Sequence, residues 1–82
     1  MSRTILRLPA VIKQRGRSRS AHYADIKAGL FVEPVALGPR ARGTPNDEVD
    51  ALVAATIAGK SEAEIRALVA KLHASRGAAV SS

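Results

Sequence analysis

The clearest hydrophobic pattern lies in the second half of the chain, where apolar residues recur at the spacing of one helix face. One such stripe ends at Gly59 and consists of Val49, Leu52, Val53 and Ile57. The next consists of Ile65, Leu68, Val69 and Leu72. Thr44 is placed to cap the first helix and Pro45 to begin it, while Ser61 and Glu64 form a capping-box pair before the second. The pattern predicts helices over about 45–58 and 62–75.

The first half of the chain predicts two shorter helices. Pro9 is tolerated in a first helical turn, and Gly16 can supply the left-handed residue that ends a helix, which indicates a helix over about 9–15. Ser18 then offers the N-cap of a second helix that ends at Gly29. Two helices joined by a three-residue turn that contains glycine are the local signature of a helix-turn-helix.

Between Gly29 and Thr44 the pattern favours strands. Pro34 and Pro39 disfavour helix, 35–37 alternates as a short strand does, and 38–43 indicates a turn into a second short strand. We therefore expect a mainly α protein with a small β-hairpin, a winged helix-turn-helix of three core helices plus a C-terminal helix. Its parts are a DNA-binding domain at 1–60, a helix at 61–76 that packs on it or serves dimerisation, and a disordered tail at 77–82.

Composition narrows the functional class. The chain has 82 residues, no cysteine and two histidines, and its apolar runs are too short for a signal sequence or a membrane span. A catalytic pocket has little to be built from, because there is no cysteine nucleophile, no histidine cluster and only Tyr23 and Phe31 as aromatic residues. We expect a cytoplasmic, nucleoid-associated protein that is not an enzyme and holds neither a cofactor nor a metal.

The charge is unevenly distributed. The net charge is +6, but residues 1–43 hold nine Lys and Arg against Asp25 and Glu33, whereas residues 44–82 hold four against five acidic residues. A strongly basic half joined to a neutral helical half is typical of a surface that faces a polyanion. A cationic surface that serves only solubility is the alternative.

The candidate binding residues fall in two groups. Free backbone N–H groups and the helix dipole favour phosphate at the start of the second helix, where four of the candidates lie, Arg17, Ser18, Arg19 and Ser20. Farther along this helix, Tyr23 and Lys27 can follow a phosphate backbone, although Tyr23 can equally pack under the wing. On the hairpin, Arg40 and Arg42 have alternate spacing, so on a strand both project to one side, as suits contact with a minor groove. His22 is expected to be a partly buried, hydrogen-bonded residue.

Several of these segments together resemble a known family. The order is a Leu8-Pro9 helix, the Gly16–Tyr23 segment with its serines at 18 and 20, Gly29-Leu30-Phe31, Pro34-Val35 and Leu37-Gly38-Pro39-Arg40. In this order and over roughly residues 4–58, the chain resembles the AlpA-type phage regulators and their excisionase relatives. The resemblance implies a MerR-like winged helix-turn-helix that binds double-stranded DNA to regulate genes of a prophage or mobile element, or to bend DNA during excision.

Two departures from the family pattern bear on the wing and the second helix. Relatives commonly have Gly-Trp where this chain has Gly43-Thr44, so a large apolar anchor of the wing is missing. They usually have Ser-Thr where it has Ser20-Ala21, which removes one hydroxyl. The alternatives are a small adaptor that docks on an acidic partner protein and, less favoured, RNA binding through the Arg/Ser-rich segment 15–20. A homodimer or cooperative assembly on DNA through the C-terminal helix is left open.

Overall fold

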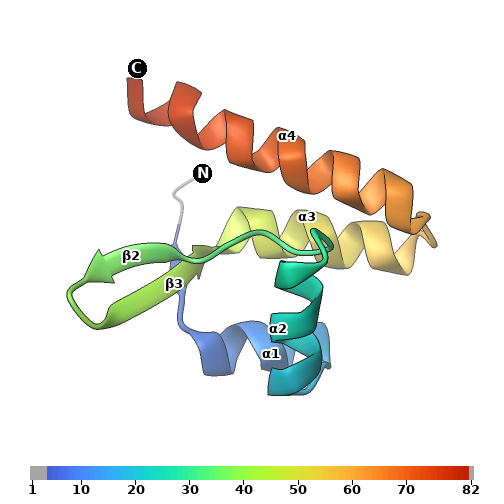
Figure 1. Ribbon diagram of the computed structural model, residues 1–82, viewed down its shortest axis with the longest axis horizontal. Helices are drawn as coiled ribbons and strands as arrows, with labels where there is room; N and C mark the ends of the chain where they lie inside the picture. The colour runs from blue at the N-terminus through green and yellow to red at the C-terminus, as the bar shows by residue number, and fades with distance from the viewer. Residues whose placement is uncertain (1–3, 82) are drawn as a thin grey trace.

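The computed structural model describes residues 4–81, with side chains through Arg76. These residues form a small α+β fold, in which four helices accompany a three-stranded antiparallel sheet of order β1-β3-β2 (Figure 1). In chain order the elements are β1 (Ile5–Leu6), α1 (Leu8–Arg15), α2 (Arg19–Lys27), β2 (Val35–Gly38), β3 (Ala41–Pro45), α3 (Asn46–Ile57) and α4 (Glu62–Ser81). The four helices and the β2–β3 hairpin were predicted, whereas β1 was not.

The boundaries of α1 and α2 follow the local signals in the sequence. Gly16 ends α1 in the left-handed conformation at φ 69°, and Gly29 follows α2 at φ 80°. The hydroxyl of Ser18 accepts a hydrogen bond of 3.2 Å from the backbone N–H of Ala21, so Ser18 is the N-cap of α2. The predicted three-residue turn between the two helices is therefore confirmed.

The predicted start of the third helix, at Pro45, is wrong by one residue. Thr44 and Pro45 belong to β3, where they pair with Leu6 and Ile5 of β1, and α3 begins at Asn46. Asn46 donates its backbone N–H to the Thr4 carbonyl at 2.7 Å and accepts from the Thr4 N–H through Oδ1 at 2.8 Å. Pairing with a strand 40 residues earlier thus overrides the local capping preference.

Two further expectations change at the hairpin and at the C-terminal helix. Arg40 lies in the turn between β2 and β3, so it does not alternate with Arg42 along one strand, as the sequence predicted it would. α4 continues to Ser81, beyond the expected end at 75. The side chains of 77–82, where a disordered tail is predicted, lie outside the described residues.

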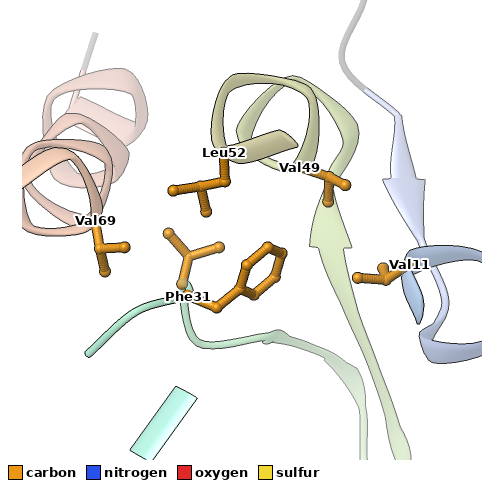
Figure 2. Close-up of a cluster of buried hydrophobic side chains, with 6 residues drawn as sticks. Val11, Phe31, Val49, Leu52 and Val69 are labelled. Carbon is orange, nitrogen blue, oxygen red and sulfur yellow. The ribbon is translucent and has the colours of Figure 1, made fainter. Parts of the chain in front are cut away.

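The core is assembled from segments far apart in the sequence. Its buried side chains are Val11, Phe31, Val32, Val49, Leu52 and Val69. In Figure 2 the Phe31 ring lies among side chains from α1, α3 and α4. Because Val69 is buried here, with Ile65, Leu68 and Leu72 packed around it, the apolar stripe of α4 is used within its own chain. α4 lies on the side of α3 opposite α1 (Figure 1).

α4 also holds the connector between α2 and β2. Arg66 donates to the carbonyl of Ala28 at 3.0 Å, at the C-terminal end of α2. Farther along α4, His73 Nε2 accepts from the Glu33 backbone N–H at 3.1 Å, and Arg76 donates to the Glu33 carbonyl at 2.7 Å. These contacts fix the segment 28–33 and thereby the position of the hairpin relative to α2.

Candidate nucleic-acid interface

The second helix, α2, has one buried and one exposed face. His22 and Asp25 point inward and are buried, with Ile26 half-buried beside them. The opposite face is exposed and consists of Arg19, Ser20, Tyr23, Ala24 and Lys27. Their spacing of three, four, seven and eight residues places them on one side of the helix. Four of the six candidates predicted on and before this helix therefore share a single solvent-facing surface.

The other two candidates at the start of α2 have roles in the fold. Arg17 forms an ion pair with Asp25, with Nε 2.9 Å from Oδ2 and Nη2 2.9 Å from Oδ1. Its side chain remains 45% exposed. Ser18 uses its hydroxyl to cap α2. The predicted cluster is thus split, because Arg17 and Ser18 shape the turn while Arg19 and Ser20 face solvent.

Asp25 is held by a second arginine that sequence reasoning missed. Arg15 Nη2 lies 2.9 Å from Asp25 Oδ2, and both side chains are largely buried. Residues 1–43 hold nine cations but only two carboxylates, of which Asp25 is one. A carboxylate among so many cations is expected to form an ion pair, and this was the signal available in the sequence. One carboxylate between two guanidinium groups leaves a positive excess at the turn between α1 and α2.

Arg15 also fixes the tautomer of His22. Its Nη1 lies 2.8 Å from His22 Nδ1, and because a guanidinium can only donate, Nδ1 is the acceptor and the imidazole proton is on Nε2. Burial, the adjacent Arg15 and, to a smaller extent, Arg17 lower the pKa of His22, with Asp25 opposing them. The ring packs edge-on against Phe31, with centroids 5.0 Å apart. His22 is therefore the buried, hydrogen-bonded residue that the sequence predicted.

The hairpin lies beside the exposed face of α2. Arg40 in its turn and Arg42 on β3 are both exposed. Tyr23 of α2 and Arg42 line the same cavity, which separates the helix from the hairpin. Tyr23 is half-exposed and its ring also approaches His22 edge-on, at 5.9 Å between centroids. Arg42 and the exposed face of α2 thus belong to neighbouring surfaces, although they are separated by the connector in sequence.

The cations divide into paired and unpaired groups. Those with a carboxylate within ion-pair distance are Arg15, Arg17, Lys60, Arg66 and Arg76. Among the side chains that the structure describes, no such partner is found for Arg7, Lys13, Arg19, Lys27, Arg40, Arg42 and Lys71. All but Lys71 come from the first half of the chain. The unpaired positive charge is therefore concentrated on α1, α2 and the hairpin.

Comparison with known proteins adds no assignment to this picture. No protein-family model, no curated protein and no solved structure matches the chain. Within residues 4–81, no helix combines the length and the apolar character needed to cross a bilayer. The same residues contain no group of three or more His, Cys, Asp or Glu side chains arranged to hold a metal ion. The function has to be inferred from the residues and their arrangement.

Proposed function

We propose that this chain binds duplex DNA in a sequence-selective manner, as a winged helix-turn-helix with α2 as the recognition helix and the β2–β3 hairpin as the wing. The observation that carries the proposal is the set of unpaired cations on these two neighbouring elements, Arg19, Lys27, Arg40 and Arg42. A folded protein that needed them for its own stability would pair them, as it pairs Arg15 and Arg76. Phosphate is the partner that such a surface attracts.

The arrangement of α2 suits entry into the major groove. Recognition helices contact base edges through their N-terminal residues, and Arg19 and Ser20 are the first two residues of α2. An arginine at this place can donate two hydrogen bonds to guanine. Tyr23 and Lys27 lie one and two turns farther along the exposed face, where they reach the sugar-phosphate backbone. Arg40 and Arg42 then contact the adjacent groove or its phosphates.

The biological role follows from the resemblance to AlpA-type regulators and excisionases. We assign the chain to the nucleoid of the cytoplasm, as a transcriptional regulator or excision factor of a prophage or mobile element. The apolar stripe of α4 lies in the core, so a homodimer on DNA through α4 would have to use the exposed face of that helix.

One observation favours the second candidate, an adaptor that docks on an acidic protein. Ile57, at the end of α3, is 82% exposed, the highest value among the large apolar side chains described. Together with Val53 it lines a shallow pocket whose other walls include Arg15 and Arg17. An apolar side chain beside guanidinium groups fits a partner segment that carries both acidic and apolar residues.

A binding titration separates the two functions. Fluorescence anisotropy is recorded with labelled duplex DNA from upstream of the chain's own gene, with scrambled duplex as competitor, at 50 and 200 mM salt. Arg19→Ala is expected to weaken specific binding about 5- to 150-fold, since it removes a base contact. Lys71→Ala, which removes an unpaired cation on α4, is the matched control and should bind as the parent does.

The outcome discriminates between base reading and a general attraction to charge. Specific binding that resists scrambled competitor and is lost in Arg19→Ala supports the proposal. Equal affinity for both duplexes, with Arg19→Ala and Lys71→Ala indistinguishable, contradicts it. In that case Ile57→Ser becomes the informative variant, because the adaptor function requires this side chain and DNA binding does not.

A further inference from the structure

The cavity between α2 and the hairpin is built like a ligand site. Its volume is about 310 Å³, at the lower end of the range of roughly 300–1,000 Å³ typical of small-molecule pockets. Leu8, Ile26 and Pro34 give it apolar walls. Tyr23 and Arg42 also line it, and because both are exposed we place them at its mouth. Such a pocket accommodates one aromatic ring with short substituents.

Two buried side chains present unused polar groups to this cavity. His22 and Thr44 both line it, and they are only 3% and 4% exposed. The proton on His22 Nε2 and the Thr44 hydroxyl make no hydrogen bond to any residue that the structure describes. Among the described side chains, however, every buried nitrogen or oxygen atom has a hydrogen-bond partner, so an atom without a partner is accessible to solvent. Both groups must therefore reach open space, and the cavity that they line provides it.

The donor character of His22 is fixed before any ligand arrives. Arg15 donates to Nδ1, so the proton is on Nε2, and we infer that this N–H is the donor that the His22 ring offers to the cavity it lines. Burial and the nearby guanidinium groups lower the pKa of His22, which keeps the ring neutral. A matching ligand therefore presents a hydrogen-bond acceptor, such as a hydroxyl or carbonyl oxygen, at its buried end.

We propose that this cavity binds a small aromatic carboxylate. The ring lies between Tyr23 and the apolar walls, a polar substituent meets His22 and Thr44 inside, and the carboxylate pairs with Arg42 at the mouth. Arg42 has no carboxylate of its own among the described side chains, so it is available to an anion. Offset stacking on Tyr23 favours a flat ring over an aliphatic chain.

Ligand binding has a consequence for DNA that rests on the proposed function. Tyr23 and Arg42 are among the residues assigned to DNA contact, and the carboxylate would occupy the guanidinium that otherwise meets phosphate. The ligand is therefore expected to lower DNA affinity. The chain would then act as an effector-responsive regulator, although ligand binding itself requires no DNA.

The test is an NMR titration of the full ¹⁵N-labelled chain with 4-hydroxybenzoate, without DNA. Saturable chemical-shift changes are expected for the backbone amides of Gly43 and Thr44 and for the ring of Tyr23. The ring signals are easily assigned, because Tyr23 is the only tyrosine in the chain. Arg42→Gln should weaken binding about tenfold or more, because it removes a charge-assisted pair. Thr44→Val keeps the shape of the side chain and removes the hydroxyl, and should weaken binding severalfold. Lys71→Gln is the control variant and should leave the affinity unchanged.

The probe panel decides the ligand class. The neutral amide 4-hydroxybenzamide should bind about tenfold more weakly than 4-hydroxybenzoate, and inorganic phosphate should bind more weakly still. Absence of saturable shifts with 4-hydroxybenzoate overturns the proposal, and so does phosphate binding of equal strength or an equal loss in Lys71→Gln. Since these measurements contain no DNA, their failure leaves the DNA-binding proposal standing, and failure of DNA binding leaves the ligand site standing.

Discussion

Arg76, near the end of α4, holds the carboxylate of Glu48 at the start of α3. Nη2 lies 2.6 Å from Oε1 and Nε lies 3.0 Å from Oε2, which is a two-point contact with a side chain only 3% exposed. The same guanidinium donates to the carbonyl of Glu33 at 2.7 Å. One side chain thus joins the last helix, the third helix and the connector that positions the hairpin.

Removal of this arginine should be strongly destabilising. Arg76→Met removes the ion pair that Arg76 makes with the buried Glu48 carboxylate, and breaking a buried pair costs about 3–5 kcal/mol in the free energy of unfolding. Urea unfolding followed by circular dichroism measures the change. Lys60→Ala, which breaks the exposed Lys60–Glu64 pair, should cost under about 1 kcal/mol. Similar losses in the two variants would mean that Glu48 does not depend on Arg76.

A double variant distinguishes the ion pair from packing. If the loss in Arg76→Met comes from the broken ion pair, then Glu48→Gln in the same chain, which removes the charge of the carboxylate, should recover part of it. A double variant less stable than Arg76→Met alone would instead assign the effect to the lost hydrogen bond with Glu33 and to packing.

Gly43 is required by the close approach of β1 to β3. A Cβ atom at this position would meet the Ile5 side chain and lie 2.9 Å from the carbonyl oxygen of Leu6. Gly43→Ala should therefore destabilise the fold by about 1–3 kcal/mol, as overpacking does. Gly38→Ala on the same hairpin is the control, because nothing lies within 4 Å of the corresponding Cβ, and it should change the stability by less than about 0.5 kcal/mol. Equal thermal denaturation midpoints would show that β1 does not pack closely on Gly43.

The features predicted from the sequence are those with a local signal. The cap at Ser18, the left-handed glycines at 16 and 29 and the stripe on α4 each involve residues within a few positions of one another. Each signal has a local physical cause, either an unpaired backbone group or the 3.6-residue period. They were sufficient for the four helices and the hairpin.

The features that were missed depend on residues far apart in the sequence. β1 has only two residues and exists because it pairs with Thr44 and Pro45, so no local period indicates it. The same pairing moves Thr44 from a helix cap into a strand and into the wall of the ligand cavity. Arg17 looked equivalent to Arg19 in the sequence, and only the fold brings it to Asp25, eight positions away. Side-chain pairing of this kind has no sequence period.

The capping box of α4 can be tested at a single carboxyl group. Ser61 and Glu64 bond reciprocally, since the Ser61 N–H donates to Oε1 at 3.1 Å and the Ser61 hydroxyl accepts from the Glu64 N–H at 3.2 Å. The hydrogen bonds from the Ser61 backbone and side chain, followed by the charge of Lys60, lower the pKa of Glu64. In Ser61→Ala we expect this pKa to rise toward 4.5, measured by NMR titration. The lost cap should lower the Tm by about 4–8 °C, and an unchanged pKa would exclude the side-chain contribution.

His22 should make the stability depend on pH in one direction. Its pKa in the folded state is lower than the unfolded value of 6.5, so below pH 6.5 the unfolded chain binds more protons. The free energy of unfolding is therefore expected to fall as the pH decreases from 7 through 6.5. Below the pKa that His22 has in the folded state, the contribution of His22 to this fall should end. His22→Gln, which can still accept from Arg15, should remove this part of the dependence in urea titrations at several pH values. His73→Gln should keep this pH dependence. A free energy of unfolding that does not change with pH in His73→Gln would mean that His73, and not His22, causes it.

Variants of Lys27 and Arg17 distinguish a cation that serves DNA binding from one that serves the stability of the fold. Lys27 is unpaired and exposed on α2, so Lys27→Ala should leave the unfolding free energy unchanged while it reduces the slope of log affinity for DNA against log salt by about 1. Arg17→Ala loses the pair with Asp25 and should cost up to about 1 kcal/mol of stability, a modest figure because the guanidinium is 45% exposed. Its salt slope should change less than that of Lys27→Ala, since this cation is already partly neutralised by Asp25. A larger change of slope for Arg17→Ala would mean that DNA displaces Asp25 and takes over the guanidinium.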